Sequence, residues 1–524
     1  MALLTSRKID QSDEFRNEPT LDYSDPKNKA DIAEAVRQVR GRLGAVYPLI
    51  IGADEVRRER TFASRNPAKA SEVIGHHAIA ERRDVDAALD AAWKAFPAWS
   101  RTTAHLRADV LFRAAQIIRE RRNELSALLM LEVGKVWDEA DGEVAEAVDL
   151  LSWYAKEMLK IDPPQRLAQI EGETADFFYV PLGAGVVISP WNFPLALTVG
   201  MLSAAIVAGN TAVVKPSSNS PTTVAWLVNI LREAGSPPGV INYVTGSGSE
   251  LGTALVDNPR VRYIAFTGSR DVGVEIYEHA GRTPKGQKWL KRVQLEMGGK
   301  NAVVVDETAD LDKAADAIVI SAFGFQGQKC SAGSRAVIVD EVYDALVPRI
   351  VERARSLVLG DPTDPATSVG PVIDASSQKK VLTYIETGKK EGKLLLGGSA
   401  RGDGFVEPTI FADVAPDARI AQEEIFGPVV ALIRARDFPH ALEIANSTDY
   451  GLTGALFSRD RQRIDEARRS FHVGNLYINR KSTGAMMGVH PFGGFNMSGT
   501  DSKAGGPDYL LFFLQGKAVG ERQG

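Results

Sequence analysis

The alternation of apolar and polar residues predicts a helical beginning and then alternating strands and helices. Apolar residues recur at helical spacing over residues 32–43, and again over residues 85–96 after a predicted N-cap at Asp84. The pattern continues over residues 106–133 and ends at Gly134, a residue type that commonly caps helices. Further along, strands are predicted at 180–189, 211–215, 240–244 and 263–266, and helices at 195–208 and 250–256. Such alternation is typical of βαβ units and a largely parallel sheet.

A second alternating region begins near Asn301 and runs past Asn479. The boundary between the two regions falls near Gly298 and Gly299, and the first fifty or so residues are predicted to form a helical extension. No repeat of fixed period and no low-complexity tract interrupts the pattern. We therefore predict an α/β fold with two domains.

One stretch could be mistaken for a membrane span, because no charged residue occurs from Phe177 to Val214. Prolines, asparagines and glycines interrupt it, so no uninterrupted apolar segment of about 20 residues forms. Strands covered on both faces of a parallel sheet have the same continuously apolar character. We interpret the stretch as buried strands and a helix, and predict no membrane interaction.

Composition and charge exclude several classes of protein. The 524 residues are 44% hydrophobic and 25% charged, which is ordinary for a globular protein. The net charge of -5 offers no general attraction to nucleic acid. The single cysteine rules out disulfides within the chain and fits a reducing compartment. The N-terminal segment lacks the pattern of a signal or transit peptide, so a cytoplasmic location is predicted.

Three residues could carry chemistry, although each also has a plain structural interpretation. Cys330 could be a nucleophile, since small and polar neighbours would let a thiolate be approached and solvated, or simply a small apolar residue. Glu296 could be a general base beside two glycines, or a buried ion-pair partner. Asn192 could donate to an oxyanion, or only shape a turn. The pair His76 and His77 lies in a strand-like stretch that would point the two rings to opposite faces, so no metal site is predicted.

Evidence for a bound dinucleotide is weak in the usual terms. The glycines at 246, 248 and 252 approach the common fingerprint but have the wrong last spacing. Ser269 follows a strand and opens a predicted helix, where backbone N–H groups could receive a phosphate. Lys215 ends a strand, which is a suitable place for a ribose contact.

Seven motifs in order give the chain a specific resemblance to the aldehyde dehydrogenase superfamily from about residue 50 to the C-terminus. They are Pro-Trp-Asn-Phe-Pro, Lys-Pro-Ser, Phe-Thr-Gly-Ser, Leu-Glu-Met-Gly-Gly-Lys-Asn, Gly-Gln-Lys-Cys, Glu-Glu-Ile-Phe-Gly-Pro-Val and Pro-Phe-Gly-Gly. The resemblance implies Cys330 as nucleophile, Glu296 as general base, and Asn192 with the Cys330 backbone N–H as oxyanion donors. It also implies a set of cofactor contacts: Ser189, Trp191, Lys215, Ser218, Gly248, Phe266, Ser269, Glu424 and Phe426.

The segment from Asn479 to Leu510 resembles one branch of the superfamily, the 1-pyrroline-5-carboxylate dehydrogenases. This branch oxidises L-glutamate γ-semialdehyde to L-glutamate in proline breakdown. The resemblance implies four substrate contacts: Ser331, Gly484, Ala485 and Phe492. Backbone N–H groups and a hydroxyl suit a carboxylate at the far end of a short aldehyde. NAD is the expected cofactor, with NADP as the alternative, because Ser218 occupies a position where many NAD-selective relatives have an acid.

The resemblance also implies a domain organisation. We expect an N-terminal helical extension (1–50), a Rossmann-like NAD-binding domain (51–165 and 186–296), a catalytic domain (297–495) and a β flap for oligomerisation (166–185 and 505–524). The hairpin at 166–179 and a final strand at 509–515 would join subunits, so a homodimer is the minimum expected assembly. Two alternatives stay open: an aldehyde dehydrogenase for another aldehyde or for transfer to coenzyme A, and a non-catalytic binding protein that keeps the fold.

Overall fold

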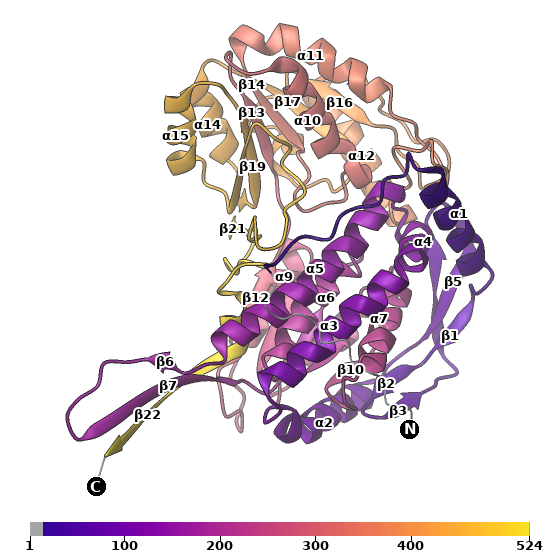
Figure 1. Ribbon diagram of the computed structural model, residues 1–524. Helices are drawn as coiled ribbons and strands as arrows, with labels where there is room; N and C mark the ends of the chain where they lie inside the picture. The colour runs from indigo at the N-terminus through magenta and orange to yellow at the C-terminus, as the bar shows by residue number, and fades with distance from the viewer. Residues whose placement is uncertain (1–13, 523–524) are drawn as a thin grey trace.

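A computed structural model describes residues 14–522 of the chain. The start of the predicted extension and the last two residues of the predicted flap therefore lie outside the described residues. Two lobes, each built on a seven-stranded sheet, pack against each other, and a long hairpin projects from the lower one (Figure 1). Among the described residues, no helix is long and apolar enough to cross a membrane.

The first sheet is parallel over five strands and has the order β12-β11-β8-β9-β10-β2-β3. Its strands are β2 (Leu49–Ile51), β3 (Asp54–Val56), β8 (Ala184–Ile188), β9 (Thr211–Lys215), β10 (Ile241–Tyr243), β11 (Tyr263–Thr267) and β12 (Arg292–Glu296). Neighbouring residues of β9 pack on opposite faces of the sheet. Val213 lies in the hydrophobic cluster that includes α2 (Arg82–Trp99), and Val214 lies in the cluster that includes α6 (Ala196–Val207). Both faces are therefore covered, which explains the continuously apolar strands.

The remaining helices of this lobe lie around the sheet. They are α1 (Pro26–Arg40), α3 (Ala104–Glu120), α4 (Arg122–Val133), α5 (Trp137–Ile161), α7 (Pro221–Glu233), α8 (Gly248–Val256) and α9 (Arg270–Ala280). A small sheet of β1 (Ala45–Tyr47), β5 (Lys69–Ala78) and β4 (Thr61–Asn66) lies beside α1. Residues 1–50 thus include β1 and β2, so this stretch is not helical throughout.

Two predictions for the helices need correction. The N-cap of α2 is Glu81 rather than Asp84, because Asp84 is the third helical residue and its carboxylate accepts a hydrogen bond from the Glu81 N–H at 2.8 Å. The helical pattern over residues 106–133 is two helices, not one. The break at Arg121 lets α3 pack against α5 while α4 packs against α1. The predicted cap at Gly134 is confirmed, with a left-handed φ of 74°.

The second sheet has the order β15-β16-β17-β14-β13-β19-β20 and is parallel except for β15. Its strands are β13 (Ala302–Val305), β14 (Arg335–Val339), β15 (Lys393–Leu396), β16 (Thr409–Ala412), β17 (Val429–Ala435), β19 (Thr453–Phe457) and β20 (Asn475–Ile478). The helices are α10 (Leu311–Phe323), α11 (Asp340–Arg355), α12 (Ala375–Glu391), α13 (Arg419–Gln422), α14 (Phe438–Asn446) and α15 (Arg461–Ser470). Val303 packs with α10 and α11 on one face, and Val304 packs with α12 and α14 on the other. The short pair β18 (Tyr450–Gly451) and β21 (Phe495–Asn496) lies where the two lobes meet.

The projecting hairpin combines β6 (Gln165–Arg166), β7 (Glu173–Pro181) and β22 (Leu514–Arg522). The predicted strand at 180–189 is in fact the end of β7 and all of β8, with a turn at Gly183 between them. The predicted final strand at 509–515 is also shifted. Residues Tyr509–Phe513 form the short helix η2, because Tyr509, Leu510 and Phe513 are buried in the core, and the strand begins only at Leu514.

Candidate active site

The carboxyl ends of the first sheet's parallel strands meet at one edge, facing the second lobe. From β8 the chain adds β9 and β10 on one side and then β11 and β12 on the other. Ligands of open α/β sheets bind at such a reversal, outside the carboxyl ends of the strands. The predicted contacts Ser189, Lys215, Phe266 and Ser269 all lie at or directly after these strand ends.

Asn192 lies in the loop between β8 and α6 and is buried. Its Nδ2 donates a hydrogen bond to the carbonyl oxygen of Gln328 at 3.0 Å. Gln328 precedes Cys330 by two residues, so this bond ties the first lobe to the segment that carries the thiol. The structure therefore brings Asn192 and Cys330 into one region although 138 positions separate them in the printed sequence.

Cys330 lies between α10 and β14, after a backbone segment of unusual conformation. Phe325 and Gln326 have φ values of 48° and 56°, a region that costs energy for residues with side chains. The buried Gln326 amide holds this turn by donating to the carbonyl oxygens of Gly134 at 3.0 Å and Pro371 at 2.8 Å. The strain is thus supported by the surrounding fold and positions the thiol.

The surroundings of Cys330 favour the protonated form of its thiol. Burial raises the pKa of the thiol to about 12, with further contributions from the carboxylates of Glu296 and Glu424. Cys330 is half-buried rather than fully enclosed, so the expectation that its thiolate can be approached and solvated stays a prediction. At neutral pH the thiol is protonated, and its proton must leave before or during attack on a carbonyl carbon.

Glu296 is the last residue of β12 and is buried. Burial raises its pKa well above the usual range, and the positive charge of Lys503 opposes this only in part. Among the described residues, neither carboxylate oxygen accepts a hydrogen bond of normal geometry, although the Gly494 N–H approaches. None of the described residues pairs with the Glu296 carboxylate. The interpretation of Glu296 as a buried ion-pair partner is therefore not supported. An unpaired buried carboxyl at a strand end is a candidate general base.

Asn301 is a site residue that the sequence analysis did not identify. Its Nδ2 donates to the carbonyl oxygens of Cys330 at 2.7 Å and Ala332 at 2.8 Å. Its Oδ1 accepts from the N–H of Thr453 at 2.9 Å. The side chain thus clamps the thiol segment to the start of β19. Its place at the end of the Glu296 motif was the only signal in the sequence.

The predicted ribose contacts have features that fit a dinucleotide. Lys215 is buried, and among residues 14–522 its Nζ donates only to the carbonyl of Pro216 at 3.2 Å. Burial lowers its pKa to about 8. A buried ammonium group with no acid beside it can donate to hydroxyls. Glu424 accepts from the Gly299 N–H at 2.9 Å, and a Cβ at Gly298 would collide with its carboxylate. These residues fit a dinucleotide cofactor.

The other predicted cofactor contacts surround the same edge. The rings of Trp191 and Phe426 meet edge to face, with centroids 5.5 Å apart. Ser218 follows β9 and donates to the carbonyl of Gly246 at 3.3 Å, while Gly248 begins α8 on the exposed surface. Ser189 is buried, and its hydroxyl has no partner among the described residues.

Three of the predicted substrate contacts come from the chain after β20 in the second lobe, and the fourth, Ser331, follows Cys330. Ser482 holds this loop against the thiol segment, since its hydroxyl donates to the carbonyl oxygen of Ser331 at 3.2 Å. Gly484 and Ala485 are two and three residues after Ser482 in the sequence. Phe492 pairs through its backbone with Ala504 at 2.8 Å and precedes Gly493, which lies against the carboxylate of Glu296. Ser331 is therefore next to Cys330 and Phe492 next to a glycine that lies against Glu296, while Gly484 and Ala485 are tied to the thiol segment only through Ser482.

Acidic residues of α5 form a second group that the sequence analysis missed. Glu139 forms an ion pair with Lys329, the neighbour of Cys330, at 2.6 Å. Glu143 forms a fully buried ion pair with Lys135 at 2.6 Å. Burial raises the pKa of Glu146 to about 7, and the charge of Glu143 adds to this. The helical spacing of these acids could have indicated that they share one face of α5. Only the fold shows that this face meets the segment that carries Cys330.

His76 and His77 are separated by the pleat of β5, as predicted. His77 is buried, stacks on Tyr47 with centroids 4.9 Å apart, and pairs with the Thr222 hydroxyl at 3.0 Å. Burial lowers its pKa to about 3, so it stays neutral. In the part of the chain that the structure describes, no group of three or more His, Cys, Asp or Glu side chains could hold a metal ion.

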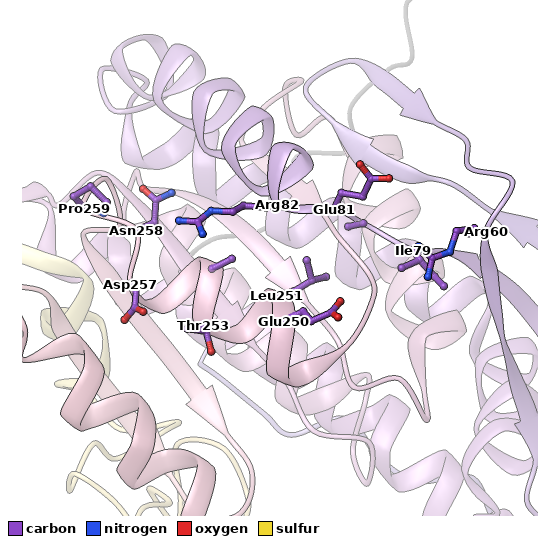
Figure 2. A pocket seen from close by; sticks show the side chains of 12 residues that line it. Arg60, Ile79, Glu81, Arg82, Glu250, Leu251, Thr253, Asp257, Asn258 and Pro259 are labelled. Atoms are coloured by element: carbon purple, nitrogen blue, oxygen red, sulfur yellow. The ribbon is translucent and has the colours of Figure 1, made fainter.

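A separate pocket of about 550 Å³ opens between the start of α2 and the helix α8 (Figure 2). Arg60, Glu81, Arg82 and Glu250 line it with charges of both signs. It includes none of the residues predicted to bind substrate or cofactor, and these lining side chains are exposed. The pocket is therefore distinct from the candidate site.

Comparison with known proteins agrees with this arrangement. The model of the aldehyde dehydrogenase family matches residues 55–519. The chain is 54% identical to 1-pyrroline-5-carboxylate dehydrogenase of Geobacillus sp. (strain WCH70), covering 97% of this chain and 99% of the relative. It is 52% identical to the same enzyme of Bacillus subtilis (strain 168), with the same coverage. A crystal structure of 1-pyrroline-5-carboxylate dehydrogenase from Thermus with bound NAD is similar with a TM-score of 0.96 and 50% identity, over 97% of this chain and 99% of that one. The chain belongs to the aldehyde dehydrogenase family and has its α/β fold.

Proposed function

We propose that this protein is a 1-pyrroline-5-carboxylate dehydrogenase. It oxidises L-glutamate γ-semialdehyde, which is in equilibrium with 1-pyrroline-5-carboxylate, to L-glutamate with NAD as cofactor. The similarity to enzymes of this name over nearly the whole chain supports the reaction. The observation that carries the proposal is the position of Cys330, whose segment is bonded to Asn192 on one side and to Asn301, five residues after Glu296, on the other.

In the proposed mechanism, Cys330 loses its proton and its sulfur attacks the aldehyde carbon, giving a thiohemiacetal. The Asn192 amide and the Cys330 backbone N–H donate to the oxygen that becomes negatively charged, as preorganised donors do in acyl transfer. Bound NAD accepts the hydride from this carbon, which leaves a thioester on Cys330. Glu296 then removes a proton from water, and the attack of this water breaks the thioester to give the acid and the free thiol.

The raised pKa of Glu296 suits this role. A carboxylate with a raised pKa binds a proton more tightly than an ordinary glutamate, so once it is ionised it is a stronger base toward water. The raised pKa of Cys330 adds a condition, because the thiol needs a nearby acceptor for its proton.

The cofactor is held by residues of both lobes in this proposal. Lys215 and Glu424 bind the two riboses, and Trp191, Ser269 and Phe426 lie around the dinucleotide, with Ser189, Gly248 and Phe266 completing the cradle. Ser218 is neutral and short, so it leaves room for a 2′-phosphate, and NADP is the alternative cofactor. A comparison of turnover with NAD and NADP separates the two.

We further propose that the loop at Gly484 and Ala485 binds the amino-acid head of the substrate through backbone N–H groups, together with the Ser331 hydroxyl and the Phe492 ring. The charged pair of Lys329 and Glu139 lies next to Cys330 and complements a head that carries both charges. A small aldehyde without these charges gains nothing from the pair.

The assembly, the domain boundaries and the location in the cell are also proposals. The hairpin of β6 and β7 leaves one of its edges open for pairing, which supports at least a homodimer joined through this flap. We propose that the chain is divided into a NAD-binding domain (51–165 and 186–296), a catalytic domain (297–495) and a flap (166–185 and 505–524). A cytoplasmic location follows from the single cysteine and from the reaction.

The first experiment is NADH formation by the purified protein with NAD and equilibrated 1-pyrroline-5-carboxylate, beside the Cys330→Ala variant. We expect saturable activity in the parent and none in the variant. Turnover of other aldehydes, but not of this one, would contradict the proposed substrate. Turnover that requires coenzyme A would indicate a different acyl acceptor. Absence of turnover with every aldehyde, in a folded protein, would favour a binding protein.

A further inference from the structure

The segment before α1, residues 14–25, lies far from the candidate site in the sequence but close to it in the fold. It forms no strand or helix and runs along α5 toward the yellow C-terminal loops, where it is drawn in dark indigo (Figure 1). Extended segments without sheet pairing keep a fixed path only where side chains bind their backbone. The contacts of this segment are therefore informative.

Two carboxylates of α5 hold the segment in place. Asp149 accepts from the Asn17 Nδ2 at 2.9 Å and from the backbone N–H of Glu18 at 2.7 Å. Asp141 accepts from the backbone N–H of Leu21 at 2.7 Å. Asp149 is only 6% exposed, and hydrogen bonds to a buried carboxylate are stronger than those between neutral groups. The path of the chain at Asn17 is thus fixed relative to α5.

The same Asn17 amide reaches the loop of the second lobe. Its Nδ2 also donates to the carbonyl oxygen of Met487 at 3.1 Å, two residues after Ala485. The neighbouring Phe15 packs edge to face on Trp153 of α5, with centroids 5.0 Å apart. Trp153 in turn lies against Gly488, where a Cβ would come within 2.6 Å of the indole ring. Asn17 and Phe15 therefore support this loop directly at Met487 and, through Trp153, at Gly488.

We propose that residues 15–17 position the loop at 482–488 and so determine how tightly the protein binds the amino-acid head of its substrate. The inference rests on the proposed function, because that function assigns the head to Gly484 and Ala485. Asn17 is a positioning residue in this scheme: it acts through Met487 and does not touch the substrate. The loop has other ties as well: Ser482 bonds to Ser331, and the Arg480 guanidinium donates to the carbonyl oxygens of Thr483 at 3.0 Å and Gly484 at 2.8 Å. Loss of the Asn17 tie should therefore loosen the loop at Met487 without releasing it altogether.

The consequence is selective. Cys330 is held by Asn301, and Asn192 by its own bond to Gln328, so neither depends on Asn17. A loosened loop should weaken the binding of the charged head and leave the chemistry at the aldehyde carbon unchanged. The structure therefore predicts an effect on the KM for the semialdehyde and on the affinity for the product, with little effect on kcat or on the KM for NAD.

The test compares Asn17→Ala with the parent and with Asn28→Ala. Asn28 also donates one side-chain bond to a backbone carbonyl, that of Asp22 at 2.9 Å, but it lies in the first turn of α1 and its side-chain amide does not bond to the loop at 482–488. We expect Asn17→Ala to raise the KM for glutamate semialdehyde and the Kd for L-glutamate by roughly three- to tenfold, the range for loss of one or two hydrogen bonds. The kcat, the KM for NAD and the kcat/KM for propanal, which has no charged head, should stay within about twofold. Asn28→Ala should behave as the parent.

A second variant and a direct measurement complete the test. Asn17→Asp keeps the size of the side chain but removes both donors, so it should reproduce the effect of Asn17→Ala. Hydrogen exchange of the intact protein should be faster at residues 482–488 in both variants. Equal losses of kcat/KM with propanal and with the semialdehyde would overturn the inference. An unchanged KM for the semialdehyde together with unchanged hydrogen exchange at residues 482–488 would overturn it as well. A parent that fails to oxidise the semialdehyde would instead overturn the proposed function, and the exchange rates would still decide whether Asn17 positions the loop.

Discussion

The side-chain amide of Asn301 donates to the carbonyl oxygen of Cys330 at 2.7 Å. The bond joins the segment after Glu296 to the segment that carries the thiol, so the proposed base and nucleophile belong to one connected unit. A second bond from the same Nδ2 to Ala332 fixes the chain on the other side of the thiol. In the described part of the chain, the relationship places the two reactive groups without a hydrogen bond to the Glu296 carboxylate.

We predict that Asn301→Ala lowers kcat by about ten- to a hundredfold, because misplacing a nucleophile by as little as 1 Å costs this much. The buried carbonyls also lose their donor, so stability should fall by about 1–3 kcal/mol. Steady-state kinetics and thermal unfolding check both effects. Asn446→Ala is the control, since Asn446 makes a similar bond to the Ser470 carbonyl away from the site. Equal kcat in the two variants would show that Asn301 does not position Cys330.

The Asn192 loop depends on a buried ion pair behind it. Glu143 Oε1 accepts from the N–H groups of Leu195 at 2.8 Å and Ala196 at 3.1 Å, and its other oxygen pairs with Lys135. The Lys135 ammonium also lies over the Phe193 ring, 3.2 Å from its centroid. We predict that Glu143→Ala destabilises the protein by about 3–5 kcal/mol, because it leaves Lys135 buried and unpaired. The double variant Glu143→Gln with Lys135→Met should lose less of the free energy of unfolding, because it leaves no buried charge. A larger loss in the double variant, measured by chemical unfolding, would contradict this account.

Asn192 itself is predicted to act on the transition state. Removal of one fixed oxyanion donor costs about 3–4 kcal/mol in comparable sites, so Asn192→Ala should lower kcat by about two to three orders of magnitude. Asn219→Ala serves as the control, since the Asn219 amide donates to Asp374 at 2.9 Å in a separate contact. Near-normal turnover of Asn192→Ala would remove this residue from the mechanism.

Glu296→Gln should separate the two halves of the reaction if hydrolysis is the only task of Glu296. Rapid mixing with NAD and substrate would then show an initial burst of NADH, up to about one equivalent per active site, followed by a stall as the thioester accumulates. Absence of the burst, in a protein that melts like the parent, would place Glu296 at the first proton transfer. That outcome would contradict a role for Glu296 in hydrolysis alone.

The raised pKa of Cys330 predicts how the thiol reacts with iodoacetamide. Only the thiolate is alkylated, so the rate should rise by about tenfold per pH unit from roughly pH 7 to pH 10 without a plateau, since the pKa lies near 12. An ionised Glu296 adds to this shift, so Glu296→Gln should be alkylated faster at the upper end of the range. Mass spectrometry of the labelled protein follows the reaction, and Cys330→Ala is the control. A plateau below about pH 8 would mean that the protein favours the thiolate after all.

The fold was largely predictable where the sequence is locally consistent. The strand at 211–215 was predicted to the residue, and the helices at 195–208 and 250–256 to within two. The strand and the first helix are buried and form apolar runs bounded by turn residues, whereas the second helix has apolar residues at helical spacing. The errors lie where tertiary contacts decide. Arg121 breaks a continuous helical pattern, and Tyr509 and Phe513 turn an apolar stretch into a buried short helix instead of an edge strand.

The sequence by itself determined the residue types of the site, their order along the chain and the family that they resemble. Only the tertiary structure decided which of them meet, what surrounds them and how they are held. Asn301, Glu143 and Asn17 carry no chemistry that a motif would reveal, yet each fixes a backbone segment of the site through hydrogen bonds. The pKa values of Cys330 and Glu296 likewise depend on burial, since the free energy of a charge is set by everything packed around it. Such properties arise from contacts between distant segments, and a linear pattern does not contain them.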